Sequence, residues 1–482
     1  MLLSRTCGIS ADAESSHDQI HAVPCTSVKE CCHWDADATW KRLRHDLERF
    51  PAGLQVLELC GGVGTGHIAL HKLLKDVAAF NVVGHYDIDE ALQPLLTASG
   101  LPLQNIHLGR KKGDILKQSP QDFPLHHLLV AGPPCPPWSS IGSRSSWEDT
   151  RSQAFDKVME IIAYHAEHGN LLLFVLENVV GMSWSTKGST EKPIDIVVKR
   201  LRKTCPGWAI EVHRVNSLDF GLPQSRTRLY VVGRRYSPEK NESYMPPLRK
   251  FHQRLPLSKC LDTSDKIPGT YTSLQRKNIR EWKALYKFEL NTEKFLNQFA
   301  VVDASRTPST RTVYTKATKH PDRCPCLTAS GPKLHVFALG PHTDETSSPL
   351  DRPMRNTERA KVQGFYGAIV DAASHMSVAD GKRIFGNAMT VPAVGCVIAR
   401  ELLGLLRALN IEKLTAILSS TETQSQRYSR TSSRTTHSES STRKRTVSFS
   451  SSSTPPTLPN EDGNPDHKRG GIAGISTKRK RL

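Results

Sequence analysis

The sequence has no long hydrophobic run and no apolar leader. No stretch of about 18 apolar residues, the length that spans a membrane as a helix, occurs in its 482 residues. The first five residues are not followed by the apolar segment of about 7–15 residues that a secretory signal requires. We therefore expect neither a membrane protein nor a secreted one.

The sequence also lacks the paired cysteines of a zinc site, and it has fewer acidic than basic residues. The eleven cysteines are irregularly spaced and lack the paired arrangement of a zinc site, so we predict mostly reduced thiols and no bound metal. Asp and Glu number 47 against 65 Lys and Arg, which gives a formal net charge of +18. This excess favours a polyanionic partner such as a nucleic acid.

The residues that are present divide the chain into five parts. Short apolar strands alternate with amphipathic helices in the second part, and a strongly apolar helix in the fourth part returns to the same domain. The third part loses this rhythm and predicts a small irregular domain, whereas the first and last are too polar to fold alone. The parts are a flexible segment (1–40), an α/β domain (41–235), which the family resemblance described below implies to be catalytic and cofactor-binding, a region (236–350) that the same resemblance implies to recognise the target, a C-terminal return (351–415) and a disordered basic tail rich in Ser and Thr (416–482).

The alternation in the second part predicts an α/β fold. A helix is expected at residues 67–75, between the first two strands, and a further helix at 391–409. Strand and helix alternation at this spacing argues for a mostly parallel sheet with helices on both faces. The expected strands cover residues 54–59, 80–86, 127–131, 171–176, 211–216 and 229–233.

The tail carries two short basic clusters. Arg443–Arg445 and Lys478–Arg481 indicate nuclear import or loose contact with nucleic acid. A solvated tail without a targeting role is the alternative. On composition, we expect a nuclear protein.

A glycine-rich turn follows the first expected strand. Residues Gly61–Gly66 permit close backbone approach to a nucleotide-like ligand, and the next helix offers its N-terminus. Asp87, at the end of the second strand, is placed to bind ribose hydroxyls, and Asp114 follows another expected strand end. These features in order predict a binding site for such a ligand.

A cysteine in a proline-rich turn follows the strand expected at 127–131. Cys135, within Gly132–Pro137, is poised there as a nucleophile at the carboxyl edge of the sheet. A buried structural cysteine is the alternative, and the rigid turn argues against it.

Two further strands bring charged groups. Glu177 ends an apolar stretch, so its carboxyl group should be partly desolvated and suited to protonate a ring nitrogen. Arg226 and Arg228 are two residues apart, which predicts that both lie on one face of a strand, where they could orient an acid or bind a carbonyl or phosphate.

Taken in order, these motifs resemble the cytosine-C5 DNA methyltransferase family. The resemblance covers residues 54–400 and implies a Rossmann-like S-adenosylmethionine-dependent methyltransferase core with a small target-recognition domain. The matching segments are Glu58–Gly66, Asp87–Asp89, Gly113–Ile115, Gly132–Ser139, Glu177–Val179, Gln224–Arg228, Glu358–Phe365 and Gly386–Pro392.

The resemblance implies a role for each matching residue. Cys135 would add to C6 of cytosine, Glu177 would contact N3 and the exocyclic amine, and Arg226 and Arg228 would steer the ring. Thiolate addition is needed because C5 of cytosine is a poor nucleophile until C6 is attacked, and a base in a duplex must first be flipped out. S-adenosyl-L-methionine would be held by Glu58, Cys60, Gly61, Gly62, Gly64, Asp87, Asp114, Ile115, Pro134, Asn387 and Ala388.

Three positions depart from the family pattern. Cys60 stands where the family usually has an aromatic residue, Pro136 stands in place of Gln, and Glu58 in place of Asp. None of the three removes a group that performs the chemistry.

The resemblance implies double-stranded DNA as partner, bound through residues 236–350 and the basic tail. A zinc site at Cys324, Cys326, His320 and His335 is disfavoured, because two cysteines separated by one residue rarely form half of a tetrahedral site. The side chains expected to contact phosphates and bases are Arg249, Lys250, Arg276, Lys277, Arg280, Trp282, Tyr286, Arg311 and Tyr314.

Two other functions stay open. The tRNA-methylating branch of the same family shares fold and mechanism, but its Cys-Phe-Thr signature is absent here. A DNA-binding regulator that has lost catalysis is the other, motivated by Cys60 and Pro136. Target sequence context and oligomeric state are not indicated.

Overall fold

The computed structural model describes residues 38–74, 78–134, 152–185, 190–236, 248, 250, 254–262, 270–288, 298–309, 320, 322–330, 333–339 and 350–420. The chain separates into two units, residues 1–428 and 429–482, and all described residues belong to the first. Cys135, Pro136, most of the N-terminal segment and the tail beyond residue 420 lie outside them.

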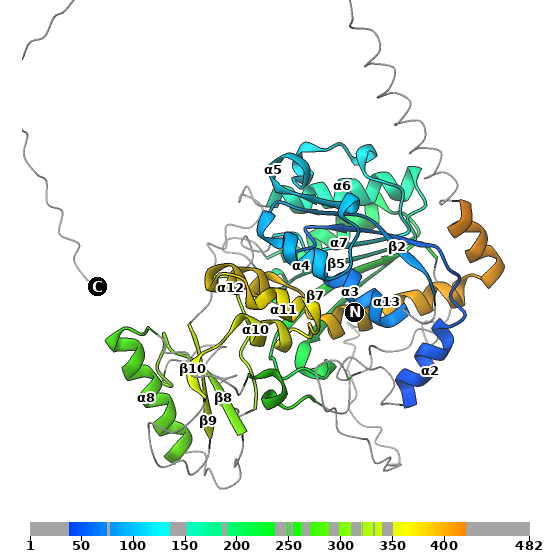
Figure 1. The fold of residues 1–482 in the computed structure, drawn as a ribbon. Helices are drawn as coiled ribbons and strands as arrows, with labels where there is room; N and C mark the ends of the chain where they lie inside the picture. Colours follow the sequence, from blue (N-terminus) through cyan, green and yellow to red (C-terminus); the bar gives the residue numbers. More distant parts are fainter. Residues whose placement is uncertain are drawn as a thin grey trace, which may run out of the picture. The chain divides into compact units, whose positions relative to one another are not determined.

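A seven-stranded sheet forms the centre of the described fold (Figure 1). Its strand order is β3-β2-β1-β4-β5-β7-β6, and only β7 runs antiparallel to its neighbours β5 and β6. The predicted α/β fold with a mostly parallel sheet is therefore confirmed. The strands are β1 (Leu54–Leu59), β2 (Phe80–Asp87), β3 (Ile106–Leu108), β4 (Leu128–Ala131), β5 (Leu173–Val179), β6 (Ala209–Asn216) and β7 (Thr227–Arg234).

Helices cover both faces of the sheet, as predicted. Strand residues alternate between two cores: in β4, Leu128 and Val130 enter one core, and Leu129 and Ala131 enter the other. The first core takes side chains from α2, α3 and α13, and the second from α6 and α7. The helices are α2 (Ala38–Leu47), α3 (Thr65–Leu74), α4 (Gln93–Ala98), α5 (Gly109–Lys112), α6 (Gln153–His168), α7 (Pro193–Thr204), α8 (Ser273–Phe288), α10 (Asn356–Val362), α11 (Ala368–Ser374), α12 (Val378–Asn387) and α13 (Val391–Ala408).

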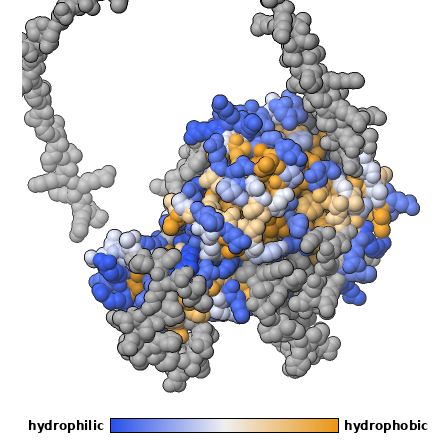
Figure 2. Space-filling view, viewed as in Figure 1, coloured by the Kyte–Doolittle hydropathy of each residue, from blue (hydrophilic) through white to orange (hydrophobic). Residues whose placement is uncertain are grey.

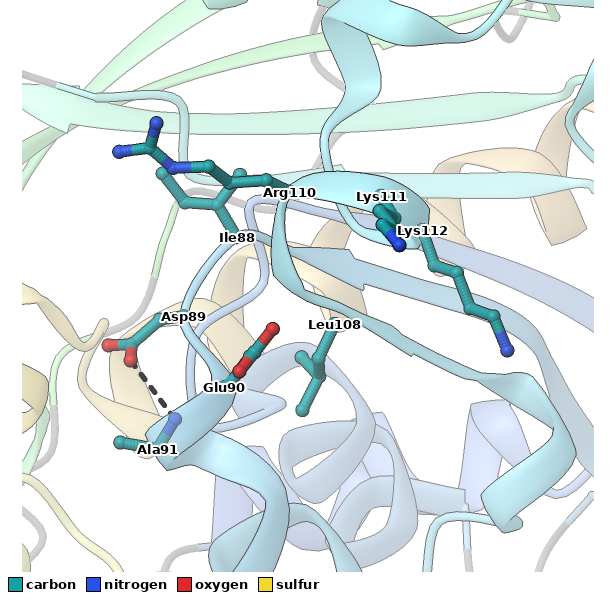
Figure 3. Close-up of a pocket in the computed structure, with 8 residues that line it drawn as sticks. All are labelled: Ile88, Asp89, Glu90, Ala91, Leu108, Arg110, Lys111 and Lys112. Carbon is teal, nitrogen blue, oxygen red and sulfur yellow. Dashed lines mark hydrogen bonds between the residues drawn. The ribbon is translucent and has the colours of Figure 1, made fainter. Parts of the chain in front are cut away.

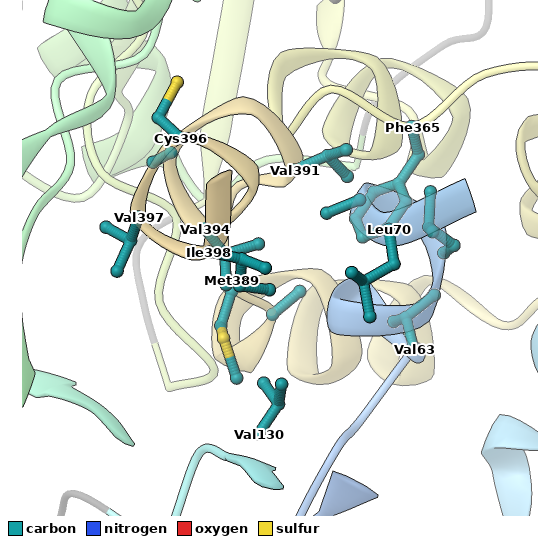
Figure 4. Close-up of a cluster of buried hydrophobic side chains, with 14 of the residues drawn as sticks. Val63, Leu70, Val130, Phe365, Met389, Val391, Val394, Cys396, Val397 and Ile398 are labelled. Atoms are coloured by element: carbon teal, nitrogen blue, oxygen red, sulfur yellow. The ribbon is translucent and has the colours of Figure 1, made fainter. Parts of the chain in front are cut away.

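Helix α13 is the central helix of the first core. Val394 and Ile398 of this helix lie among Leu70 of α3, Val130 of β4 and other buried side chains (Figure 4). The stretch that includes α13 is apolar enough to cross a membrane, but 89% of its most apolar window is buried within the fold. Its hydrophobicity is thus that of a core helix.

The target-recognition region is more regular than predicted. A second sheet of order β10-β9-β8 is antiparallel throughout, and α8 packs on it (Figure 1). One face joins the first core through Val301 and Val336, and the other meets α8 through Val302 and Phe337. The expectation of an irregular domain was wrong because these short strands pair across long separations that leave no local pattern. Their bounds are β8 (Gln298–Asp303), β9 (Leu334–Leu339) and β10 (Asp351–Pro353).

A last helical segment, residues 411–420, follows α13. Its Leu414 and Leu418 are buried in the first core. The folded chain therefore continues beyond the boundary predicted at residue 415.

Candidate active site

The carboxyl edge of the sheet collects the predicted site residues. Strands β1, β4 and β5 are parallel neighbours, so Cys60, Gly132 and Glu177 come from adjacent strand ends at the same edge. Strand β7 runs the other way and so begins where β5 ends. Its first residues reach this edge for that reason.

The glycine-rich turn leaves room above its backbone. Gly62 has φ +56°, and a methyl group on its Cα would meet no atom within 4 Å. On the other side, a Cβ on Gly61 would lie 2.5 Å from the His85 ring, so only glycine fits. The amide of Gly64 donates to Gly61 O at 3.1 Å and closes the turn. Open space on one side and tight packing on the other suit a backbone that contacts a ligand.

Glu58 lies beneath this turn rather than in it. Its side chain is 1% exposed, and its two oxygens accept from the His67 amide at 2.7 Å and meet His85 Nδ1 at 2.8 Å. Both oxygens join β1 to β2 and to the first turn of α3, so Glu58 stabilises the fold beneath the turn, and its contact with the cofactor stays a prediction. His85, which the sequence analysis missed, is its buried partner.

Asp87 is the acid nearest the turn. Its carboxylate accepts from the amides of Gly62 and Asp89, each at 3.0 Å. Burial raises the pKa of Asp87, although His85, the backbone amides of Gly62 and Ile88, and Arg383 oppose the rise. Burial, with Asp87 and Asp114 nearby, also raises the pKa of the Cys60 thiol, so Cys60 is a neutral, partly buried wall of the site.

An open cavity of about 760 Å³ adjoins Asp87 (Figure 3). Ile88 borders it with 59% of its surface exposed, and Asp89 is held by a bond from the Ala91 amide. An exposed apolar side chain between two carboxylates suits a ligand with both a ring and hydroxyl groups. The sequence analysis gave Ile88 no role, although its place between two acids at a strand end was visible.

Other predicted cofactor residues divide into exposed and buried ones. Asn387 is exposed where α12 ends, and the Asp114 carboxylate accepts from the Leu116 amide at 3.1 Å. The side chains of Ile115 and Ala388 are only 3% and 5% exposed and pack in the two cores. Their side chains thus have a packing role, and their contact with the cofactor, which would then involve the backbone, stays a prediction.

Glu177 and Arg228 form an ion pair at the edge. The Arg228 Nε lies 3.0 Å from Glu177 Oε1, and both side chains are nearly buried. In the register of β5 and β7, Val179 pairs with Arg228 and Glu177 with Tyr230. Strand β5 runs through Val179, so Glu177 lies within it rather than after it. The antiparallel register of β5 and β7 brings the Glu177 carboxylate and the Arg228 guanidinium together.

The residues that precede Cys135 are hydrogen-bonded to both neighbouring strands, β1 and β5. The Gly132 amide donates to Leu59 O at 3.2 Å, and Asn178 Nδ2 donates to Pro133 O at 3.3 Å. Pro134, the last described residue before Cys135, is partly buried. Residues 132–134, which precede Cys135, are therefore held to β1 and to the strand that carries Glu177.

Arg226 lies near Arg228 but donates to backbone carbonyls, whereas Arg228 pairs with Glu177. It precedes β7, is 3% exposed, and donates through Nη1 to Leu327 O at 2.7 Å and Gly386 O at 3.2 Å. Although β7 begins only at Thr227, the guanidinium groups of Arg226 and Arg228 lie 3.6 Å and 3.9 Å from the same Cys326 Sγ, which agrees with the prediction that the two side chains share one face. Arg226 points into backbone carbonyls of two distant segments.

Cys326 is a site residue that the sequence analysis considered only as a zinc ligand. Its Sγ lies 3.6 Å from Arg226 Nη1 and 3.9 Å from both terminal nitrogens of Arg228. His335 meets Tyr271 Oη and Asp351 Oδ1, each at 2.7 Å. Within the described part of the chain, no cluster of three or more His, Cys, Asp or Glu side chains could hold a metal ion.

The predicted nucleic-acid contacts also divide. Trp282 and Tyr286 are 0% and 1% exposed in the core between α8 and the small sheet, so the prediction that they meet bases was wrong. Lys250 is exposed and pairs with Asp219 at 3.3 Å. Arg276, Lys277 and Arg280 are exposed on α8, whereas Arg249, Arg311 and Tyr314 lie outside the described residues.

This sheet, with a glycine turn after its first strand and Asp87 at the end of the second, is the core of a class I S-adenosylmethionine-dependent methyltransferase; Asp114 follows α5 rather than the end of β3 as predicted. The family model described as C-5 cytosine-specific DNA methylase matches residues 54–403. The chain belongs to this family.

Individual relatives agree with the family. Type II methyltransferase M.HaeII from Haemophilus aegyptius is 32% identical over 181 residues, which are 37% of this chain and 52% of that protein. M.HpaII from Haemophilus parainfluenzae is 28% identical over 346 residues, 70% of this chain and 86% of its own. The chain thus spans about half the length of M.HaeII and most of M.HpaII.

A solved structure shares the fold. The S. pombe Dnmt2 methyltransferase superposes with a TM-score of 0.50 at 19% identity, over 73% of this chain and 99% of its own. At this identity the likeness concerns the fold alone.

Proposed function

We propose that this chain transfers a methyl group from S-adenosyl-L-methionine to C5 of a flipped-out cytosine in double-stranded DNA. The observation that carries the proposal is the ion pair of Glu177 and Arg228 at 3.0 Å, whose strand β5 also holds the residues that lead into Cys135. A buried carboxyl group, a guanidinium and a thiol at one sheet edge are the groups that activation of a pyrimidine ring needs.

The residues of the chain would act on the ring in order. Cys135 as thiolate forms a bond to C6, and the displaced electron pair moves toward C5, which then attacks the methyl group. Glu177 binds N3 and the exocyclic amine and stabilises the ring in this state, while Arg228 holds Glu177 and faces the ring oxygen. Transfer breaks the bond between the methyl group and sulfur and leaves S-adenosyl-L-homocysteine. A solvent base then takes the C5 proton, and its electron pair re-forms the C5–C6 double bond as the Cys135–C6 bond breaks and restores the free thiolate. The covalent adduct and these roles are proposals, since Cys135 lies outside the described residues.

The residues at the glycine turn fit the cofactor. The open space above Gly62, the acceptor Asp87 and the cavity beside Ile88 offer a backbone surface, a hydroxyl-binding carboxylate and an apolar wall. S-adenosyl-L-methionine, when bound, supplies an electrophilic methyl group. Gly61, Gly62, Gly64, Asp87, Asp114 and Asn387 would hold it.

The partner and location follow from charge. We propose that DNA is bound through the exposed cations of the target-recognition region and by the basic tail, and that Arg443–Arg445 and Lys478–Arg481 direct nuclear import. The net charge of +18 supports a polyanionic partner.

Methyl transfer from labelled S-adenosyl-L-methionine tests the proposal. Unmethylated duplex DNA and bulk tRNA are offered side by side, with Cys135→Ser as the blank. Label at C5 of cytosine in DNA is the expected result. Label in tRNA alone would assign the chain to the tRNA-methylating branch, and DNA binding without any label would favour an inactive regulator. Full activity of Cys135→Ser would overturn the covalent mechanism.

A further inference from the structure

We propose that Arg226 is a positioning residue that couples the cofactor side of the site to the target-recognition sheet. In this role it holds the turn at Gly386–Asn387 and the segment Cys324–Ala329 in one arrangement, and does not itself touch the cytosine. The inference rests on the proposed function for the identity of the two ligands.

The first support is what the guanidinium contacts. One nitrogen, Nη1, donates to the carbonyl oxygens of Leu327 and Gly386, and Cys326 Sγ is 3.6 Å away. A buried guanidinium is stable only when such acceptors replace water. The two acceptor carbonyls belong to segments that are far apart in sequence, one leading into β9 and the other ending α12.

The second support is how firmly Arg226 is anchored. Its amide donates to Ser217 Oγ at 3.1 Å, and its carbonyl accepts from the Ser217 amide at 2.9 Å. These bonds fix its backbone at the start of β7, two residues before Arg228. A shift of either held segment would therefore be felt at the strand that carries Arg228.

The third support is that the held segments touch each other. A Cβ on Gly386 would lie 2.3 Å from the carbonyl carbon of Thr328 and from the amide nitrogen of Ala329. Cys324 is also bonded on both sides to the chain before β7, from its amide to Pro223 O at 2.8 Å and from the Ser225 amide to its carbonyl at 2.9 Å. Asn387, which follows Gly386, is a proposed cofactor contact, and β9 is the middle strand of the small sheet.

These contacts give a mechanical reason for coupling. Ordering of the Gly386–Asn387 turn by the cofactor would order Cys324–Ala329 through Arg226 and the close contact at Gly386. That segment would then present the small sheet to the nucleic acid in a fixed arrangement. By linkage, the nucleic acid would strengthen cofactor binding by the same factor.

Binding measurements with Arg226→Lys test the proposal, with Arg228→Lys two residues away as the matched control. Calorimetry gives the Kd of S-adenosylhomocysteine with and without a duplex oligonucleotide, and single-turnover kinetics give the methyl-transfer rate at saturation. In the wild type each ligand should tighten the other about fivefold or more, the lower range of typical coupling. Arg226→Lys should weaken cofactor binding and bring the coupling close to onefold, because the lysine nitrogen ends one bond short of the position of Nη1 and both hydrogen bonds would be stretched. Arg228→Lys should keep the coupling and lose rate.

Several outcomes would overturn the proposal. If the wild type binds the duplex with the same Kd with and without cofactor, the two ligands are not coupled and the proposal fails. If Arg226→Lys keeps the coupling but does not transfer methyl groups, Arg226 contacts the target cytosine instead. If no nucleic acid is bound or methylated, the proposed function fails, but the positioning role of Arg226 can still be tested. Weaker binding of S-adenosylhomocysteine by Arg226→Lys than by Arg228→Lys then supports this role, and equal binding of it by the two variants refutes the role.

Hydrogen exchange on the wild type keeps the test independent of whether a variant folds. The cofactor alone should slow amide exchange in residues 324–339. Unchanged exchange there would contradict the proposal.

Discussion

At the scale of single residues, the buried carboxylate of Asp87 is expected to determine the pH below which the affinity for the cofactor falls. Its pKa lies above the ordinary value of about 3.9 because burial disfavours the charged form. The folded state therefore binds this proton more tightly than the unfolded chain does. The stabilising effect of that proton is present at low pH and is lost as the pH rises through the raised pKa.

The affinity for S-adenosylhomocysteine should therefore fall as the pH drops through this raised pKa. Protonated Asp87 loses an acceptor for ribose hydroxyls, so the loss should start at a higher pH than an ordinary aspartate would give. Calorimetry across about pH 4 to 8 measures it. Asp87→Asn should bind weakly at every pH with a flat profile; a wild-type profile in that variant would exclude Asp87 as the titrating group.

Glu177→Gln should lower the rate of methyl transfer by about 10²-fold or more, the scale of a lost acid–base group. The amide keeps the shape of the side chain but cannot carry the charge that Arg228 faces. The Kd of the cofactor should not change, since Asp87 and the glycine turn are untouched. Single-turnover kinetics and calorimetry check both, with exposed Glu167→Gln on α6 as control. An unchanged rate would remove Glu177 from the chemistry.

The sequence predicted the identity of the edge residues better than their roles. Glu177 and Asp87 were expected at strand ends, because a buried strand followed by an acid is a local pattern. The contacts of Arg226 were not predictable, since they involve the carbonyls of Leu327 and Gly386, far away in sequence.

At the scale of elements, α8 has one buried face and one basic face. Ile279, Trp282 and Tyr286 are buried against the small sheet or beside it, whereas Arg276 and Arg280, with Lys277 between them, face solvent. Figure 2 shows hydrophilic side chains over the visible side of α8. Arg276 and Arg280 are one helical turn apart, about 6 Å along the axis, which suits successive phosphates.

Replacing Arg276, Lys277 and Arg280 by Ala should weaken DNA binding and flatten its salt dependence. Each lost phosphate contact lowers the slope of log Kd against log salt by about 0.9, so a change of about 2–3 is expected. The matched control removes the same charge from α7, at exposed Lys199, Arg202 and Lys203. Fluorescence anisotropy at several salt concentrations compares the two. Equal effects would mean that only net charge matters.

The strands of the main sheet were predictable because each is a continuous apolar run flanked by turns. The small sheet was not. Strands β8 and β9 are six residues each, and the residues that pair, such as Val301 with Val336, are far apart in sequence. Likewise, the aromatic residues of α8 could be taken for base contacts until the sheet that buries them was known.

At the scale of the whole molecule, the fold ends at or beyond residue 420. Removal of residues 421–482 should leave cofactor binding and the saturated rate unchanged, but should weaken DNA binding at low salt, since Lys and Arg outnumber Asp and Glu in this segment. Removal from residue 411 should also lower the melting temperature, because Leu414 and Leu418 are buried and each such side chain contributes about 2–5 kcal/mol. Calorimetry and anisotropy on both truncations measure this. Inactivity of the variant that lacks only residues 421–482 would show that the tail takes part in the chemistry.

The position of α13 has a consequence for biosynthesis. This helix is among the last folded elements to leave the ribosome, yet it fills the middle of one face of the sheet, against α3 and β4. Until it emerges, Val130 and Leu70 have no cover, and a nascent chain keeps a broad apolar surface exposed. Ribosome-bound chains that end before residue 391 should therefore recruit chaperones and resist refolding, whereas chains long enough to expose α13 should become protease-resistant in a single step.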